Sequence, residues 1–113
     1  MTVRTRVVVE SGATYDDPSS DLLLKLLTEF EGHAHDFVIL ERPGDPAGQT
    51  YIQVAHENVS PWRYQLEYRD GAPDRHFQTF TGDVATVHRA FVGWAAEKDG
   101  WSDGQVWTRL VLE

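Results

Sequence analysis

Two pairs of extended segments, each joined by a cluster of turn residues, constrain the fold of this chain more than any other feature. Residues 36–42 and 50–56 flank a loop at 43–48 with two prolines and two glycines, which do not readily continue a strand. Residues 62–69 and 75–80 flank a second turn cluster at 70–74. Each pair therefore predicts an antiparallel hairpin.

One register in each hairpin sorts the side chains into an apolar face and a polar face. It places Leu40 opposite Ile52 in the first hairpin and Tyr68 opposite Phe77 in the second. Because a slip of one residue would move every apolar side chain to the other face, the pattern predicts these registers. The polar face then carries Tyr51, Gln53, Gln65, Glu67, Arg69, His76 and Gln78.

Two other stretches have the three- and four-residue spacing of amphipathic helices. The apolar stripe of the first is formed by Leu22, Leu23, Leu26, Leu27 and Phe30, and that of the second by Val84, Val87, Phe91, Trp94 and Ala95. For the first helix we expect Asp17 as the N-cap, Pro18 as the first helical residue and Gly32 as the end. For the second helix we expect Thr81 or Asp83 as the N-cap and Gly100 as the end.

The two ends of the chain complete the sheet. Residues 3–10 alternate in the manner of a strand. Residues 105–112 have apolar side chains at both odd and even positions, which point to opposite faces of a strand. This pattern predicts a strand covered on both faces or lying well inside the sheet. The order is then strand, helix, four strands, helix, strand. We predict a single α+β domain over residues 1–113, with a mainly antiparallel sheet of five to six strands and two helices on one face.

Charge and composition exclude several functions. The formal net charge of −8 argues against non-specific nucleic-acid binding and against a polybasic membrane attachment, because both need a basic surface. The absence of cysteine excludes a disulfide framework and thiolate chemistry. The longest nearly apolar run, residues 90–96, is far shorter than the roughly 20 residues that cross a bilayer. We expect a cytoplasmic protein, and its residue usage is typical of GC-rich bacteria.

The sequence contains no recognisable active site. No serine lies in a Gly-x-Ser-x-Gly turn, and no glycine-rich phosphate loop precedes a helix. His33 and His35 form the most metal-like pattern, but no third ligand follows at a typical spacing. We expect no metal and no cofactor. The alternative is a small enzyme or ligand-binding domain that uses histidines near the sheet, which are His33, His35, His56, His76 and His88.

Three further residues carry local expectations. Trp62 and Trp101 each follow a turn, where a tryptophan more often holds a loop against the core than contacts a partner. Gly93 lies within the second helix, where glycine costs about 1 kcal/mol relative to alanine. We expect it to allow close packing on a strand.

Two surfaces are candidates for binding a protein partner. The polar sheet face is open if both helices cover the apolar face, and its Tyr, Arg and His side chains combine contact area with hydrogen-bonding groups. Residues 10–41 hold eight acidic residues and one lysine, so attraction of a basic partner would focus there. The candidates in that segment are Asp16, Asp17, Asp21, Glu29 and Glu31. An ordinary solvated sheet face and a solvated helix face are the alternatives.

Several segments together suggest a family. They are Thr50-Tyr51-Ile52, the strand and turn at residues 66–71, the helix from Asp83 to Phe91, and Val106-Trp107. Across residues 36–110 this arrangement resembles small bacterial immunity proteins of polymorphic-toxin systems, particularly those linked to nucleic-acid deaminase toxins. The resemblance implies a catalytically inert protein that neutralises a toxin by binding it, and no individual contact residue carries over.

The leading hypothesis from the sequence is therefore a non-enzymatic protein-binding domain of the immunity type, with a partner of basic charge. A small enzyme or ligand-binding domain is the first alternative. A homodimeric interaction protein that pairs through an edge strand is the second, so both a monomer and a homodimer stay open.

Overall fold

A computed structural model describes residues 2–57 and 63–110 of the chain, and strands outnumber helices among them. The strands of the N-terminal half are β1 (Arg6–Val9), β2 (Thr14–Asp16), β3 (Phe37–Glu41) and β4 (Thr50–His56). Those of the C-terminal half are β5 (Tyr64–Asp70), β6 (His76–Thr81) and β7 (Thr108–Leu110). The helices are α1 (Ser20–Glu31) and α2 (Val84–Ala95).

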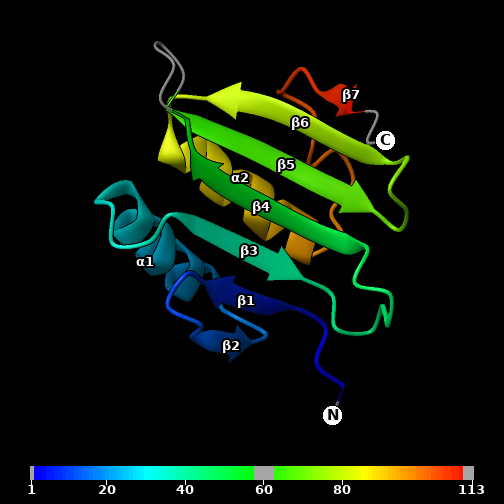
Figure 1. Ribbon diagram of the computed structural model, residues 1–113, viewed down its shortest axis with the longest axis horizontal. Helices are drawn as coiled ribbons and strands as arrows, with labels where there is room; N and C mark the ends of the chain where they lie inside the picture. The colour runs from blue at the N-terminus through cyan, green and yellow to red at the C-terminus, as the bar shows by residue number, and fades with distance from the viewer. Residues whose placement is uncertain (1, 58–62, 111–113) are drawn as a thin grey trace.

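All seven strands belong to one antiparallel sheet in the order β2-β1-β3-β4-β5-β6-β7 (Figure 1). The predicted hairpin registers are confirmed: Leu40 pairs with Ile52, and Tyr68 pairs with Phe77. The α+β class is also confirmed. The expected count of five to six strands is wrong, because residues 14–16 add an edge strand beside β1.

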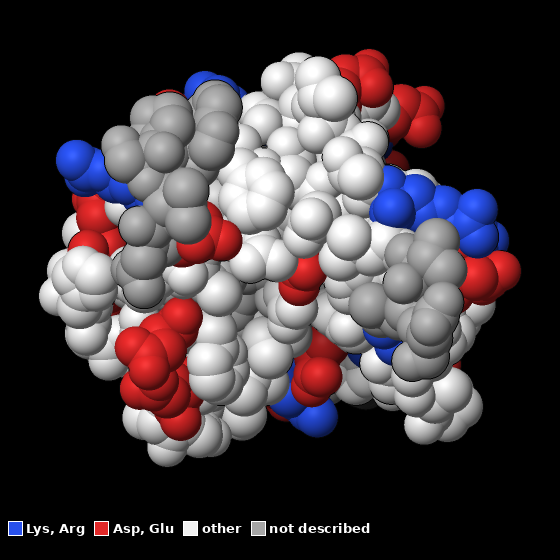
Figure 2. Space-filling model, turned by 45° about the horizontal axis from the view of Figure 1, so that its top comes forward, with Lys and Arg blue, Asp and Glu red and all other residues white. Residues whose placement is uncertain are grey.

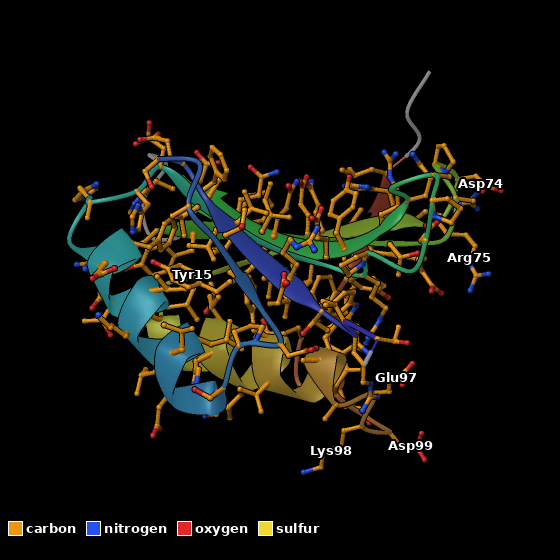
Figure 3. All side chains as sticks on the ribbon, turned by 90° about the horizontal axis from the view of Figure 1, so that it is seen from below. Tyr15, Asp74, Arg75, Glu97, Lys98 and Asp99 are labelled. Carbon is orange, nitrogen blue, oxygen red and sulfur yellow. The ribbon has the colours of Figure 1, made fainter. Side chains whose placement is uncertain are left out.

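Both helices lie on the same side of the sheet (Figure 3). The sheet contributes buried aliphatic side chains at every second position, and the two helices meet them with their apolar stripes. The largest fully buried side chains include Phe30, Phe91, Leu27, Leu40 and Ile52. The side of the sheet without helices is therefore the one that remains available for contacts.

Helix α1 begins later than the sequence suggested. Its N-cap is Ser19, whose hydroxyl accepts a hydrogen bond from the Leu22 amide at 3.1 Å, so Asp17 and Pro18 precede the helix. Asp17 has a positive φ of 46° and accepts instead from the backbone amides of Arg4 and Thr5. The helix ends at Gly32 as predicted.

Helix α2 is capped by Asp83, one of the two predicted residues, but ends at Ala95 rather than at Gly100. Its end is a Schellman motif, in which the amides of Glu97 and Lys98 donate to the carbonyls of Trp94 and Gly93. The chain then turns back, so that Trp101 packs over Gly93. Gly93 therefore makes room for a loop tryptophan, and the expected contact with a strand is wrong.

The loop after α2 covers the part of the sheet that the helices leave bare. Trp101 and Trp107 both make edge contacts with Tyr68, with ring centroids 4.9 and 4.8 Å apart. Trp101 thus holds its loop against the core, as expected, whereas Trp62 lies outside the described residues.

The last strand differs from its prediction. β7 spans only Thr108–Leu110 and is an edge strand paired with β6. Two of the apolar residues behind that prediction lie outside the strand. The Trp107 ring belongs to the aromatic cluster of the loop, and Val106 is 88% exposed. Val111 and Leu112 lie outside the described residues. Among the described residues, neither helix is long and apolar enough to cross a membrane.

Candidate protein-binding face

The seven polar residues predicted for one side of the hairpins lie on β4, β5 and β6, on the side of the sheet without helices. We call that side the open face and the seven residues the polar ladder. Strand alternation places them there, because their neighbours in sequence point into the core. Figure 3 shows the side chains of the open face standing above the sheet, opposite the helices. The pairing aligns Gln53, Glu67 and Gln78 in one row and Tyr51, Arg69 and His76 in the next.

Glu67 is the centre of the polar ladder. One of its carboxylate oxygens accepts from Gln53 Nε2 at 2.7 Å, and the other accepts from Gln65 Nε2 at 2.9 Å. Gln65 Nε2 also donates to Gln78 Oε1 at 3.0 Å. The Glu67 side chain is only 16% exposed. Because both oxygens have donors, this carboxylate tolerates a low-water environment without a counter-ion in direct contact.

Arg69 connects the two ends of the second row. Its Nη1 donates to Gln49 Oε1 at 2.7 Å, and its Nε donates to His76 Nδ1 at 3.1 Å. The guanidinium also lies over the Tyr51 ring, 5.7 Å from its centroid. These contacts fix a long side chain that would otherwise sample many rotamers.

The contact with Arg69 defines the state of His76. Since an arginine Nε always carries hydrogen, His76 Nδ1 must be the acceptor, and the neutral ring therefore carries its proton on Nε2. That Nε2 faces Glu67 Oε1 at 3.7 Å. The ring is 4% exposed and makes an edge contact with Tyr51. Burial raises the pKa of the Tyr51 hydroxyl, against the opposing effect of the Arg69 cation, and nearby Glu67 raises it further.

Apolar side chains flank the polar ladder on the open face. The pairing places Phe37, Ala55 and Phe80 in the row beyond Gln65, and Val8 and Ile39 in the row that leads to Gln53. All five are partly exposed. Figure 2, which views this side obliquely, shows mostly uncharged side chains across the middle, with a few acidic ones among them and basic ones toward the borders. Apolar and aromatic side chains beside hydrogen-bonding groups supply the two kinds of contact that protein interfaces combine.

The structure does not bring the acidic candidates of the N-terminal segment into one site. Asp16 lies on edge strand β2 and pairs with Arg6 at 2.7 Å, and Asp17 binds backbone amides. Glu29 contacts His35, whereas Glu31 accepts from the Tyr64 hydroxyl at 3.0 Å. Asp21 is exposed in the first turn of α1. Four of these five carboxylates thus have structural partners, and the helix does not present them as a single patch.

Three histidines gather near the C-terminal end of α1. His56 donates from Nε2 to the Phe30 carbonyl at 2.8 Å and stacks between the rings of Phe30 and His33. His35 contacts Glu29 through Nε2, while its Nδ1 is buried without a hydrogen-bond partner among the described residues. A cavity of about 240 Å³ is lined by Glu31, His33, His56, Glu57, Arg63 and Tyr64.

The fourth and fifth histidines lie elsewhere. His88 contacts Ser20, but its Nε2 lies closer to the Ser20 carbonyl (3.0 Å) than to the hydroxyl (3.3 Å), so the ring is not oriented as a base for that hydroxyl. His76 and His56 lie toward opposite ends of their strands, so these two histidines do not share one site. Within residues 2–57 and 63–110, no group of three or more His, Asp or Glu could hold a metal ion.

Sequence reasoning missed one member of the network. Gln49 precedes β4 in the loop, and its carbonyl oxygen fixes Arg69. No periodicity marks such a position, since it lies outside the alternating strand. Its only local signal is its place between the glycine of the turn and the first strand residue.

Comparison with known proteins finds no relative of this chain: no family model matches it, and neither does a curated protein or a solved structure.

Proposed function

We propose that this chain is a non-enzymatic protein-binding domain that neutralises a toxin in the cytoplasm by covering it with the open face. The observation that carries the proposal is the polar ladder, whose side chains are ordered by one another before any partner arrives. A pre-ordered surface loses less side-chain entropy on binding, about 0.5–1.5 kcal/mol for each long side chain already fixed. The apolar residues on either side supply contact area.

The proposed partner is a protein domain of basic charge. The chain carries a net charge of −8, so a cationic partner would be attracted to it at long range, within a Debye length of about 8–10 Å in ordinary salt. The open face itself is nearly balanced, because Asp16, Glu41 and Glu67 accompany Arg6 and Arg69. The charge of the whole chain would therefore provide the long-range attraction, whereas the open face would provide the complementary contact surface.

The edge strands of the sheet favour partner binding through the open face over pairing of an edge strand with another chain. Both described edge strands, β2 and β7, are three residues long, and short edges with charged side chains resist pairing with another chain. β2 also uses Asp16 to hold Arg6. A homodimer formed through an edge strand is therefore the less favoured use of the sheet, and light scattering tests it directly.

The test is protection against a toxin. The immunity function predicts that a toxic domain is encoded beside the gene of this chain. We would co-express the chain with that domain and measure growth, then titrate the two purified proteins by calorimetry. Ala55 lies on the open face between Phe37 and Gln65, whereas Ala85 is exposed on α2. Ala55→Arg and Ala85→Arg make the same chemical change on opposite sides of the molecule.

We expect wild type and Ala85→Arg to protect the cells and bind the toxin, and Ala55→Arg to lose both. Circular dichroism should show that both variants remain folded. Protection that survives Ala55→Arg would exclude the open face as the interface. Absence of protection and binding by the wild type would exclude the immunity function itself.

The cavity at His33 and His56 supports a second candidate, a small-ligand site. Its walls combine two stacked imidazoles with carboxylates and a phenol. Metal analysis of the purified chain, followed by His33→Ala and His56→Ala variants, separates the two functions. A bound metal or small molecule lost in these variants would favour the ligand site, whereas loss of toxin binding only in Ala55→Arg would favour the open face.

A further inference from the structure

His76 is the one buried histidine of the described residues that lies within the polar ladder. It is 4% exposed, yet it belongs to the face that the proposed function assigns to a partner. Two neighbouring strands contribute ionisable side chains that face the His76 ring. Tyr51 faces it from β4, and Arg69 and Glu67 face it from β5. From β7 the paired residue is Leu110, which does not titrate, and the adjacent Arg109 donates to the Asp74 carbonyl.

The contact between Arg69 and His76 exists in only one protonation state of the ring. At 3.1 Å from Arg69 Nε, the Nδ1 atom must offer a lone pair. A proton on Nδ1 would set two donors and two positive charges against each other at that distance. Arg69 Nε would then have to move away from Nδ1, while the bond from Arg69 Nη1 to Gln49 would still restrain the far end of the guanidinium.

The same proton would strengthen a different contact. Nε2 of His76 lies 3.7 Å from Glu67 Oε1, slightly beyond hydrogen-bond distance. A charged imidazolium would attract that oxygen, which also accepts from Gln65. Protonation therefore exchanges one arrangement of the polar ladder for another. In the neutral state of His76, Arg69 donates to both His76 and Gln49, and Glu67 accepts from the glutamines. In the charged state, Arg69 keeps only its bond to Gln49, and Glu67 turns toward His76.

We propose that His76 is a positioning residue whose protonation releases Arg69 and rearranges the polar ladder, so that binding through the open face weakens as the pH falls. This inference rests on the proposed function for its effect on binding, but not for the rearrangement itself. Histidine is the side chain that ordinarily titrates between about pH 5 and 8.

The rearrangement can be tested on the chain alone by nuclear magnetic resonance. Two-bond proton–nitrogen spectra should show the His76 ring in the neutral Nε2–H form at pH 7.5. The Arg69 Nε–H signal should be protected from solvent exchange at that pH and should lose its protection with the same midpoint as the His76 ring. A ring protonated on Nδ1 at pH 7.5, or an Arg69 signal that ignores the titration of His76, would overturn the inference.

The variant His76→Asn separates positioning from mere packing. The amide oxygen of asparagine can accept from Arg69 Nε in place of Nδ1, but it does not titrate. We expect His76→Asn to keep the Arg69 signal protected from pH 7.5 to 5.5, whereas His76→Phe should lose the protection at both pH values.

The effect on binding is measured with the toxin domain that the co-expression experiment uses. Affinity of the wild type should fall about tenfold between pH 7.5 and 5.5, which is the scale of one charge-assisted hydrogen bond, and that of His76→Asn should stay constant. Equal pH dependence in both proteins would refute regulation by His76 while leaving the open face as the interface. Failure of the toxin to bind at either pH would refute the proposed function and this regulation, whereas the magnetic resonance result would still decide the rearrangement.

Discussion

Replacing Gly93 by alanine sets two effects of known sign against each other. In a helix interior, alanine is about 1 kcal/mol more favourable than glycine, because it restricts the unfolded backbone. The new methyl group, however, would lie 2.8 Å from Trp101 Cβ and 3.5 Å from Trp101 Cα. The first distance is shorter than two carbon atoms tolerate, so either α2 or the loop must move.

The loop has little freedom to move. The Trp101 amide donates to the Lys98 carbonyl, and the Lys98 amide donates to the Gly93 carbonyl. The Trp101 ring also packs against Tyr68 and Trp107, with centroids 4.9 and 5.8 Å away. Overpacking of this kind costs about 1–3 kcal/mol. After the gain in helix propensity of about 1 kcal/mol is subtracted, Gly93→Ala should lower the free energy of unfolding by about 1 kcal/mol.

The assay is urea unfolding followed by far-ultraviolet circular dichroism. Gly32→Ala is the matched control, because its Cβ would meet only the Glu29 and Thr28 carbonyls at 3.6 and 3.7 Å; it should raise the free energy of unfolding by about 0.4–1 kcal/mol. In a Trp101→Gly background, which removes the colliding atom, Gly93→Ala should become stabilising. A gain of about 1 kcal/mol from Gly93→Ala in the wild-type chain would refute the reasoning.

Two further predictions concern carboxylates. Glu67→Ala removes the acceptor of Gln53 and Gln65 and should cost about 2 kcal/mol in urea unfolding, since each charge-assisted bond contributes about 1.5–3 kcal/mol and water reaches the open face to replace part of it. Glu97→Ala, which breaks an exposed pair with Arg4, should change stability by less than about 1 kcal/mol; equal losses would contradict the central place of Glu67. Hydrogen bonding to Asp36, burial and the Asp36 charge raise the pKa of Glu10, so its contribution to stability is present in acid and lost as the pH rises through the folded-state pKa. Glu10→Gln should therefore raise the melting temperature at pH 7 and match the wild type near pH 3, and an advantage that persists in acid would contradict the assigned cause.

The hairpin registers could be predicted because two independent requirements agree. Leu40 and Ile52 must share the core face, and their neighbours Glu41 and Tyr51 must share the other. Because the side chains repeat every two residues, a slip of one residue would violate both requirements. The turn sequences fix the lengths of the connections, so sequence and packing lead to the same pairing.

Element ends were less predictable, because several residues compete for the same role. Asp17 and Ser19 are both good N-cap residues. The choice depends on the segment before β1, because the amides of Arg4 and Thr5 donate to the Asp17 carboxylate. Similarly, α2 ends before Gly100 because Trp101 must return to the aromatic cluster. Tertiary contacts of this kind leave no local pattern in the sequence.

The membership of the polar ladder followed from the registers, but its chemistry did not. Alternation shows that Glu67, Arg69 and His76 share a face. It does not show that Arg69 donates to Nδ1 of His76, since that depends on the rotamers of both side chains. The tautomer of His76, and with it the proposed response to pH, is visible only in the structure.

The internal bonding of the polar ladder also bears on how a partner could cover it. A carboxylate buried by a partner without donors would cost several kcal/mol, yet Glu67 already has donors on both oxygens. Covering the open face therefore requires no cation from the partner at this point. A basic partner would instead contribute to the encounter rate through the charge of the whole chain. If so, added salt should slow association with the toxin domain while changing dissociation little, because screening acts on exposed charges and not on the hydrogen-bonded centre.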